Sequence, residues 1–338
     1  MSGGARPIVA CVGAGRMGRG MAHCFAYAGY EVHLLDAKAR SVESRKIHFE
    51  ETAAEIRGSL ETVASLGGFD AGAIDGIVSR ISMFSLDQAG PALENAKFVF
   101  EAAPETDEAK RTALALIDRA ADRRAIVAST TSTYLSTQLA GWSGRPARFL
   151  NAHWLNPAFI VPLVEVSPTD ETERAAIDEM RALLEDVGKV PVVCKPSPGY
   201  IVPRIQALAM NEAARLVEEG VASAEDIDRA VKYGFGFRFG VLGLLEFIDW
   251  GGGDILYHAS RYLSESMKDD RFAAPDIVRA NMDEGRNGLR DGRGFYDYRG
   301  TDVAAYRRER LKELLGVLVR AGLHRQPADI AAAAGGSK

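Results

Sequence analysis

The chain has 338 residues, 47% apolar and 26% charged, which is the ordinary mixture of a globular protein with about two domains. Its formal net charge of −5 argues against binding nucleic acid or an anionic membrane through bulk positive charge. The three cysteines, Cys11, Cys24 and Cys194, are far apart, which excludes a disulfide scaffold and a thiolate zinc site. Because no signal peptide and no apolar run of membrane-spanning length is visible, we expect a cytoplasmic protein.

The first half of the chain alternates short apolar runs with helical patterns, which is typical of a parallel sheet covered by helices. We predict eight strands, at residues 8–12, 31–35, 80–84, 98–100, 125–128, 149–152, 163–166 and 190–194. An insert around residues 37–67 carries Ile56, Leu60 and Val63 at helical spacing. This insert is long enough for a helical hairpin.

A change of pattern follows the last predicted strand. Residues 196–199 read Pro-Ser-Pro-Gly, a cluster that breaks regular structure, and amphipathic helical patterns dominate beyond it. We therefore predict one domain over residues 1–198 and a smaller, all-helical domain over residues 199–325. Residues 326–338 are small and polar, and we expect a disordered tail there.

A glycine-rich turn follows the first predicted strand. Residues 13–18 read Gly-Ala-Gly-Arg-Met-Gly, and a helix-compatible segment comes next. In such a turn Gly13 permits the tight bend, Gly15 lets a pyrophosphate approach the backbone, and Gly18 lets helix and strand pack closely. The N-terminus of the following helix supplies free N–H groups and partial positive charge for phosphates.

An acidic residue, Asp36, ends the second predicted strand, 18 residues after Gly18. A carboxylate there accepts hydrogen bonds from ribose hydroxyls and repels a 2′-phosphate, which favours NAD over NADP. The alternative is that Asp36 only caps a helix in a nucleotide-free protein. Because strand, turn, helix and acid occur in order, we predict an α/β fold with a doubly wound, mostly parallel Rossmann-type sheet that binds NAD.

His153 differs from the other five histidines because it directly follows a predicted strand, 149–152, and precedes a turn. Ligands of open α/β sheets bind outside the carboxyl ends of the strands. Glu165 lies 12 residues later, in the next predicted strand. If that strand turns back beside His153, its carboxylate can orient the imidazole as a general base; otherwise Glu165 faces solvent on an edge strand.

Two further segments leave predicted strands at their carboxyl ends. Residues 129–133 are all serine or threonine, and they form either a simple cap and turn or a hydrogen-bond donor to a substrate oxygen. Residues 101–105, Glu-Ala-Ala-Pro-Glu, form either a plain turn or one wall of a nicotinamide pocket. No cluster of histidine, cysteine and carboxylate shows metal-ligand spacing.

Together these segments resemble the L-3-hydroxyacyl-CoA dehydrogenase family over nearly the whole chain. The segments that carry the resemblance are residues 12–18, 101–105, 129–132, 151–157, 162–166, 197–202, 246–249 and 292–298. The resemblance implies an NAD-binding domain followed by a helical domain that forms a homodimer. It also implies that His153 is the catalytic base, Glu165 its orienting acid, and Ser132 the serine that contacts the reacting oxygen of the substrate.

The resemblance extends to the cofactor site. It implies that Arg16 and Met17 contact NAD together with the glycines of the turn. Asn156 matches an asparagine near the nicotinamide, and Glu105 and Lys110 match residues that line the cofactor site.

Two positions depart from the family pattern. Where the family carries an asparagine that contacts substrate, this chain has Pro203, which lacks a side-chain amide, and Gln206 is the nearest replacement. The family's helical insert carries many lysines near the CoA phosphates, whereas residues 37–60 hold five basic and four acidic side chains.

We therefore predict an NAD-dependent oxidoreductase that interconverts a short (S)-3-hydroxyacyl-CoA, such as 3-hydroxybutyryl-CoA, and its 3-oxoacyl-CoA. One alternative is the same chemistry on a free hydroxy acid of the carnitine, sugar-acid or hydroxymethyl-pyridine-acid type. Another is a non-catalytic, NAD-binding protein of the lens-crystallin type, against which the presence of Ser132, His153 and Glu165 argues.

Overall fold

A computed structural model describes residues 6–327 of the chain. The chain divides into two compact units, one ending at Met210 and the other beginning at Asn211. The predicted domain boundary after residue 198 stays a prediction. Most of the predicted tail, from residue 328 onward, lies outside the described residues.

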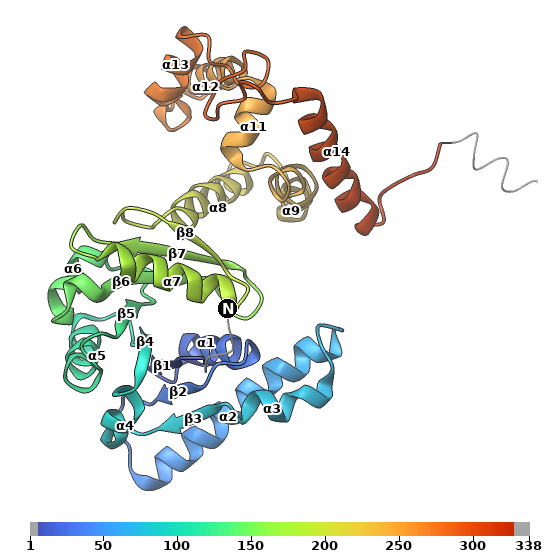
Figure 1. The fold of residues 1–338 in the computed structure, drawn as a ribbon. Helices are drawn as coiled ribbons and strands as arrows, with labels where there is room; N and C mark the ends of the chain where they lie inside the picture. Colours follow the sequence, from blue (N-terminus) through green and yellow to red (C-terminus); the bar gives the residue numbers. More distant parts are fainter. Residues whose placement is uncertain (1–5, 328–338) are drawn as a thin grey trace, which may run out of the picture. The chain divides into compact units, whose positions relative to one another are not determined.

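The first unit is built on one sheet of eight strands in the order β3-β2-β1-β4-β5-β6-β7-β8. The strands are β1 (Ile8–Val12), β2 (Val32–Leu35), β3 (Ile81–Phe84), β4 (Ala96–Glu101), β5 (Ile126–Ser129), β6 (Phe149–Trp154), β7 (Leu163–Pro168) and β8 (Val190–Val193). All neighbours are parallel except β6 and β7, which are antiparallel. The strand order reverses between β1 and β4, so the prediction of a doubly wound, mostly parallel sheet is confirmed (Figure 1).

The end of β6 differs from the sequence prediction. The strand continues to Trp154 instead of stopping at residue 152, so His153 lies inside the strand and not after it. The reason is the antiparallel pairing with β7, which continues through His153 opposite Glu165 and Trp154 opposite Val164. The strand prediction therefore placed the end of β6 two residues early.

Helices cover both faces of this sheet. They are α1 (Arg16–Tyr27), α2 (Val42–Ser65), α3 (Ile74–Val78), α4 (Ala89–Leu93), α5 (Asp107–Ala120), α6 (Ser136–Ser143) and α7 (Arg174–Asp186). The next helix, α8 (Val202–Glu218), begins in the first unit and ends in the second. The insert at residues 37–67 is one long helix, α2, and not a hairpin; its neighbour α3 comes later. Residues 42–65 contain no proline and only one glycine, Gly58, so nothing interrupts this helix.

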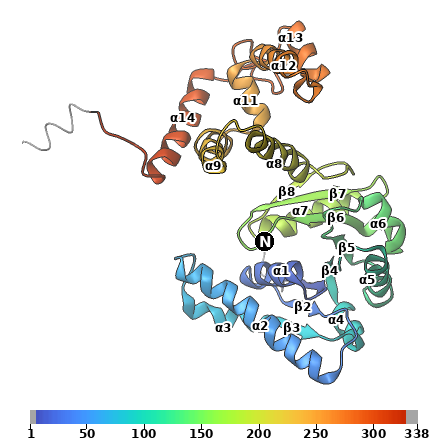
Figure 2. The same cartoon turned by 180° about the vertical axis from the view of Figure 1, so that it is seen from behind.

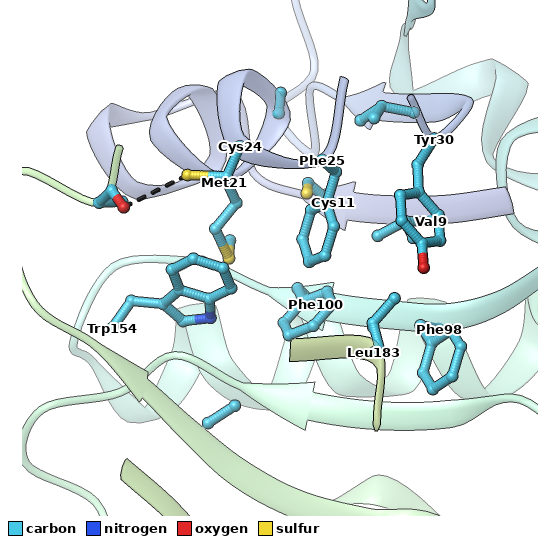
Figure 3. Packing of buried hydrophobic residues seen from close by; sticks show 14 of the residues in the cluster. Val9, Cys11, Met21, Cys24, Phe25, Tyr30, Phe98, Phe100, Trp154 and Leu183 are labelled. Carbon is cyan, nitrogen blue, oxygen red and sulfur yellow. Dashed lines mark hydrogen bonds between the residues drawn. The ribbon is translucent and has the colours of Figure 1, made fainter. Parts of the chain in front are cut away.

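Two apolar layers hold the first unit together, one on each face of the sheet. Residues of α1, α2, α3 and α7 pack in one layer, and residues of α4, α5 and α6 pack in the other. At the centre of the first layer the ring of Phe25 lies 5.2 Å from that of Phe100 and 5.7 Å from that of Trp154 (Figure 3). The Trp154 ring thus anchors the carboxyl end of β6 in the core, directly beside His153.

Among its described residues the second unit contains helices and no strand, as predicted. It contains α9 (Ala224–Ala230), a π-helical segment (Val231–Gly236), α10 (Phe237–Phe239), α11 (Leu244–Gly251), α12 (Gly253–Met267), α13 (Asp276–Asp283) and α14 (Val303–Arg320). Helices α12 and α13 pack side by side (Figure 2). The buried carboxylate of Asp249 accepts hydrogen bonds from the backbone N–H groups of Phe295 and Tyr296, which fixes the loop before α14.

Within residues 6–327, no helix is both long enough and apolar enough to cross a membrane. The predicted cytoplasmic location stays a prediction.

Candidate active site

The glycine-rich turn between β1 and α1 has the geometry of a dinucleotide cradle. Gly13 has a φ of +115°, and a Cβ there would lie 2.6 Å from the carbonyl oxygen of Ala102. A Cβ on Gly18 would lie 1.9 Å from the carbonyl oxygen of Gly13, so helix and turn pack too closely for any side chain. Among the described residues, a Cβ on Gly15 would meet nothing within 4 Å, and no side chain caps α1. The turn therefore fits a pyrophosphate on the free N–H groups of this helix.

Asp36 stands at the carboxyl end of β2, where a ribose binds in this fold. Its side chain is 4% exposed and accepts a hydrogen bond of 3.3 Å from the backbone N–H of Lys38. It also forms an ion pair with the guanidinium group of Arg40. Both Asp36 and Arg40 line the same cleft as the glycine-rich turn.

That cleft has a volume of about 1050 Å³ and lies entirely within the first unit. It is lined by most of the predicted site residues, namely Gly13, Gly15, Arg16, Met17, Asp36, Glu105, Ser132, His153 and Asn156. Pro203, the position that departs from the family pattern, lines it as well. The structure therefore brings the nucleotide turn and His153 into one continuous space.

His153 and Glu165 face each other across the antiparallel pair β6 and β7. The Nδ1 atom of His153 lies 2.9 Å from Oε2 of Glu165, and its Nε2 atom lies 3.1 Å from Oγ of Ser132. The other carboxylate oxygen of Glu165 accepts hydrogen bonds from the backbone N–H groups of Ile201 (2.9 Å) and Val202 (2.8 Å). An ionised carboxylate only accepts, so Nδ1 carries the proton in the neutral ring and Nε2 accepts from Ser132.

Glu105 anchors the loop that carries Ser132. One of its oxygens accepts from the backbone N–H of Ser132 at 2.8 Å, and the other accepts from the hydroxyls of Thr131 (2.7 Å) and Thr133 (3.1 Å). The hydroxyl run after β5 is therefore more than a simple turn, because three of its members share one carboxylate in the cleft wall.

Lys110 does not line the cleft but lies behind its wall. Its side chain is 1% exposed, and its Nζ atom contacts both oxygens of Glu101, at 3.0 and 3.1 Å, and the carbonyl oxygen of Ala103 at 3.1 Å. Glu101 is fully buried and also accepts from the hydroxyl of Ser129. Burial raises the pKa of Glu101, and the ammonium group of Lys110 opposes this shift. Lys110 therefore contacts residues of the wall and not the cleft itself, and its predicted role at the cofactor site stays a prediction.

Of two further predicted residues, Asn156 lines the cleft and Gln206 does not. Asn156 lines the cleft just after β6, before a cis peptide bond to Pro157. Gln206 is exposed on α8 and does not line the cleft, so its proposed substitution for the family asparagine stays a prediction.

Two residues near the site were given no role of their own in the sequence analysis. Glu101 belongs to the predicted wall segment 101–105, but its pairing with Lys110 was not predicted. That pairing had a readable signal, since a charged residue that ends an apolar strand with a lysine nine positions later suggests a buried pair. Tyr200, whose ring stacks on His153, follows a glycine in a loop and had no signal of its own.

Comparison with known proteins assigns the family. Residues 8–197 match the family described as 3-hydroxyacyl-CoA dehydrogenase, NAD binding domain, and residues 199–298 match the C-terminal domain of the same enzymes. The chain therefore belongs to the 3-hydroxyacyl-CoA dehydrogenase family, as its motifs predicted. As a member of that family it is an NAD-dependent oxidoreductase.

Individual relatives carry different substrate names. The chain is 33% identical to the 3-hydroxybutyryl-CoA dehydrogenase of Bradyrhizobium diazoefficiens, covering 86% of this chain and 95% of that protein. It is 29% identical to the 5-formyl-3-hydroxy-2-methylpyridine 4-carboxylate 5-dehydrogenase of Mesorhizobium japonicum, covering 91% and 96%. The structure of an Archaeoglobus fulgidus 3-hydroxyacyl-CoA dehydrogenase matches with a TM-score of 0.73 and 30% identity, covering 94% of this chain and 100% of that one.

The pairing of Asp36 with Arg40 predicts how cofactor preference can be changed. We expect Asp36→Ser to weaken NADH binding and to tighten NADPH binding by about 10- to 100-fold, because the freed guanidinium can then pair with the 2′-phosphate. Fluorescence titration of the two reduced cofactors measures both dissociation constants. In Asp36→Ser/Arg40→Ala the gain for NADPH should disappear; a gain that persists would show that Arg40 plays no part.

Proposed function

We propose that the chain interconverts a short-chain (S)-3-hydroxyacyl-CoA and its 3-oxoacyl-CoA, with His153 as the general base. The observation that carries this proposal is the chain of hydrogen bonds from Glu165 through His153 to Ser132 in the cleft that also holds the nucleotide turn. The matched family and the 3-hydroxybutyryl-CoA dehydrogenase relative support the substrate class.

The glycine-rich turn and Asp36 would hold NAD, with Asn156 and the wall at residues 101–105 beside it. The chemistry that NAD supplies when bound is acceptance of a hydride at its nicotinamide ring. The residues of this chain handle the proton. Nε2 of neutral His153 accepts the proton of the substrate hydroxyl as the carbinol becomes a ketone.

Glu165 and Ser132 assist this proton transfer in different ways. The carboxylate of Glu165 holds the tautomer with Nδ1 protonated and stabilises the imidazolium that forms. The hydroxyl of Ser132 lies next to Nε2 and can donate a hydrogen bond to the same substrate oxygen, where negative charge develops. In the reverse direction the imidazolium returns its proton to the forming alkoxide.

His153→Gln tests the assignment of the base. We expect its turnover to fall by roughly 10²- to 10⁴-fold, because the amide cannot accept the hydroxyl proton, while the dissociation constant of NADH stays unchanged. Initial rates by NADH absorbance and a fluorescence titration measure the two quantities. His324→Gln, an exposed histidine after α14, serves as the matched control and should behave as the native protein. Native turnover in His153→Gln would refute the role of His153.

A free hydroxy acid is the second candidate substrate, and two features of the chain favour it. Pro203 lines the cleft where the family asparagine contacts substrate, so that polar contact is missing. The helix α2 carries three basic and five acidic side chains, a charge balance poorly suited to CoA phosphates. In addition, the Mesorhizobium japonicum relative is named for a pyridine carboxylate.

Comparing acetoacetyl-CoA with free acetoacetate as oxidants of NADH separates these substrates. We expect kcat/KM to be at least about tenfold higher for the thioester, since the CoA carrier would contribute about 1.4 kcal/mol or more of binding energy. Equal values would favour the free acid. Absence of NADH oxidation with both compounds and with a panel of other 3-hydroxy acids would favour the non-catalytic alternative.

We further infer that the chain forms a homodimer through its helical unit. This unit leaves large apolar side chains exposed, including Ile255, Tyr262 and Met267 on α12 and Leu311 and Leu315 on α14. Such surface is commonly covered by a partner. Sedimentation equilibrium should give twice the chain mass of 36.5 kDa, and Leu311→Glu should shift the species toward one chain. A single-chain mass for the native protein would contradict this inference.

A further inference from the structure

Tyr200 has contacts that none of the roles above explains. It lies in the first unit, ten residues before the division, and only 7% of its surface is exposed. Its φ is +45°, in the left-handed region, although it is not a glycine. A strained conformation of this kind persists only where the surrounding contacts hold it in place, and it occurs often at functional sites.

The ring of Tyr200 lies flat against the imidazole of His153. The two ring centroids are 4.7 Å apart, and the planes differ by 8°. The face of an aromatic ring carries partial negative charge, so it interacts more favourably with an imidazolium than with a neutral imidazole. The stack therefore favours the state of His153 that has accepted a proton.

The hydroxyl group of Tyr200 links the loop that carries Ser132 to strand β6. It donates a hydrogen bond of 2.8 Å to the carbonyl oxygen of Thr131, the residue before Ser132. It accepts one of 2.9 Å from the side-chain amide of Asn151, which lies two residues before His153 on β6. Burial raises the pKa of Tyr200, so the phenol remains a donor at neutral pH.

The two residues that follow Tyr200 contact Glu165, the partner of His153. The backbone N–H groups of Ile201 and Val202 both donate to Glu165. With φ values of +73° at Gly199 and +45° at Tyr200, the chain presents an aromatic ring to His153 and then two N–H groups to its acid. One short segment thus fixes the imidazole and its carboxylate together.

We propose that Tyr200 is a positioning residue of the reaction, whose ring holds and stabilises the protonated imidazole of His153 and whose hydroxyl keeps Ser132 opposite Nε2. The proposal rests on the proposed function only for the role of His153 as base. The other titratable groups near this stack are Glu165 on β7, Glu105 in the loop after β4 and Cys194 after β8. They remain in place in the variants described next.

The first test is a titration of the His153 ring by NMR in protein that is labelled at histidine and free of substrate and NAD, with His153→Gln assigning the signal. In Tyr200→Leu the titration midpoint should fall by about half a pH unit to one unit, because the imidazolium loses its stacking partner. In Tyr200→Phe the ring remains, and the midpoint should stay at its native value.

The second test separates the hydroxyl from the ring. We expect Tyr200→Phe to lower kcat by about 3- to 10-fold, since the hydrogen bond to the loop of Ser132 is lost, with KM and the dissociation constant of NADH unchanged. Tyr134→Leu is the matched control: Tyr134 is two residues after Ser132, but its phenol bonds to Asp107 and its ring packs on Trp142. In Tyr134→Leu the titration midpoint of His153 should equal that of the native protein.

The outcomes distinguish this proposal from the proposed function. A native midpoint in Tyr200→Leu, or a native kcat in Tyr200→Phe while His153→Gln is inactive, overturns the role of Tyr200 alone. Because the titration needs no substrate, a shifted midpoint supports the stack even if the thioester is not the substrate. Thermal unfolding shows whether Tyr200→Leu is folded. If it is not, the kinetics of Tyr200→Phe decide whether Tyr200 has a role: a lower kcat with an unchanged KM supports the role, and a native kcat overturns it.

Discussion

The buried carboxylate of Glu165 is the interaction on which the site depends. A fully buried charge is tolerated only when hydrogen bonds replace the water it has lost, and here one imidazole and two backbone N–H groups do so. One donor belongs to β6, and the other two belong to the start of α8, the positive end of a helix. The carboxylate of Glu165 therefore links β6 to the start of α8, and it also sets the tautomer of His153.

Two further carboxylates hold the segments after β4 and β5, which also line the cleft. Glu101 is held from behind by Lys110, and Glu105 gathers the hydroxyl loop that presents Ser132. Each of these two carboxylates accepts hydrogen bonds from three groups, and a fully satisfied network of this kind makes a site rigid. Such rigidity would serve the proposed proton transfer, since catalytic groups must be held within about 0.5 Å of their productive geometry.

The sequence predicted the parts of the molecule that repeat or that follow local rules. Alternating apolar runs were enough for eight strands, and the glycine turn with Asp36 was enough for the nucleotide site. The pairing of His153 with Glu165 was left open because a spacing of 12 residues fits both a reversal and an edge strand. Only the antiparallel register of β6 and β7 decides it. The stack of Tyr200 depends on a left-handed backbone, which a non-glycine residue does not signal.

The hydrogen bonds of the Glu165 carboxylate explain why proline is tolerated at residue 203. The N–H groups at the start of a helix lack partners within the helix, and here Glu165 takes those of Ile201 and Val202. Pro203, in the first turn, has no N–H to satisfy, so it leaves the hydrogen bonds of His153 and Glu165 intact. What it removes is a side-chain amide from the cleft that it lines. Under the proposed function, proline at this position would therefore affect recognition of the substrate and leave the proton transfer intact.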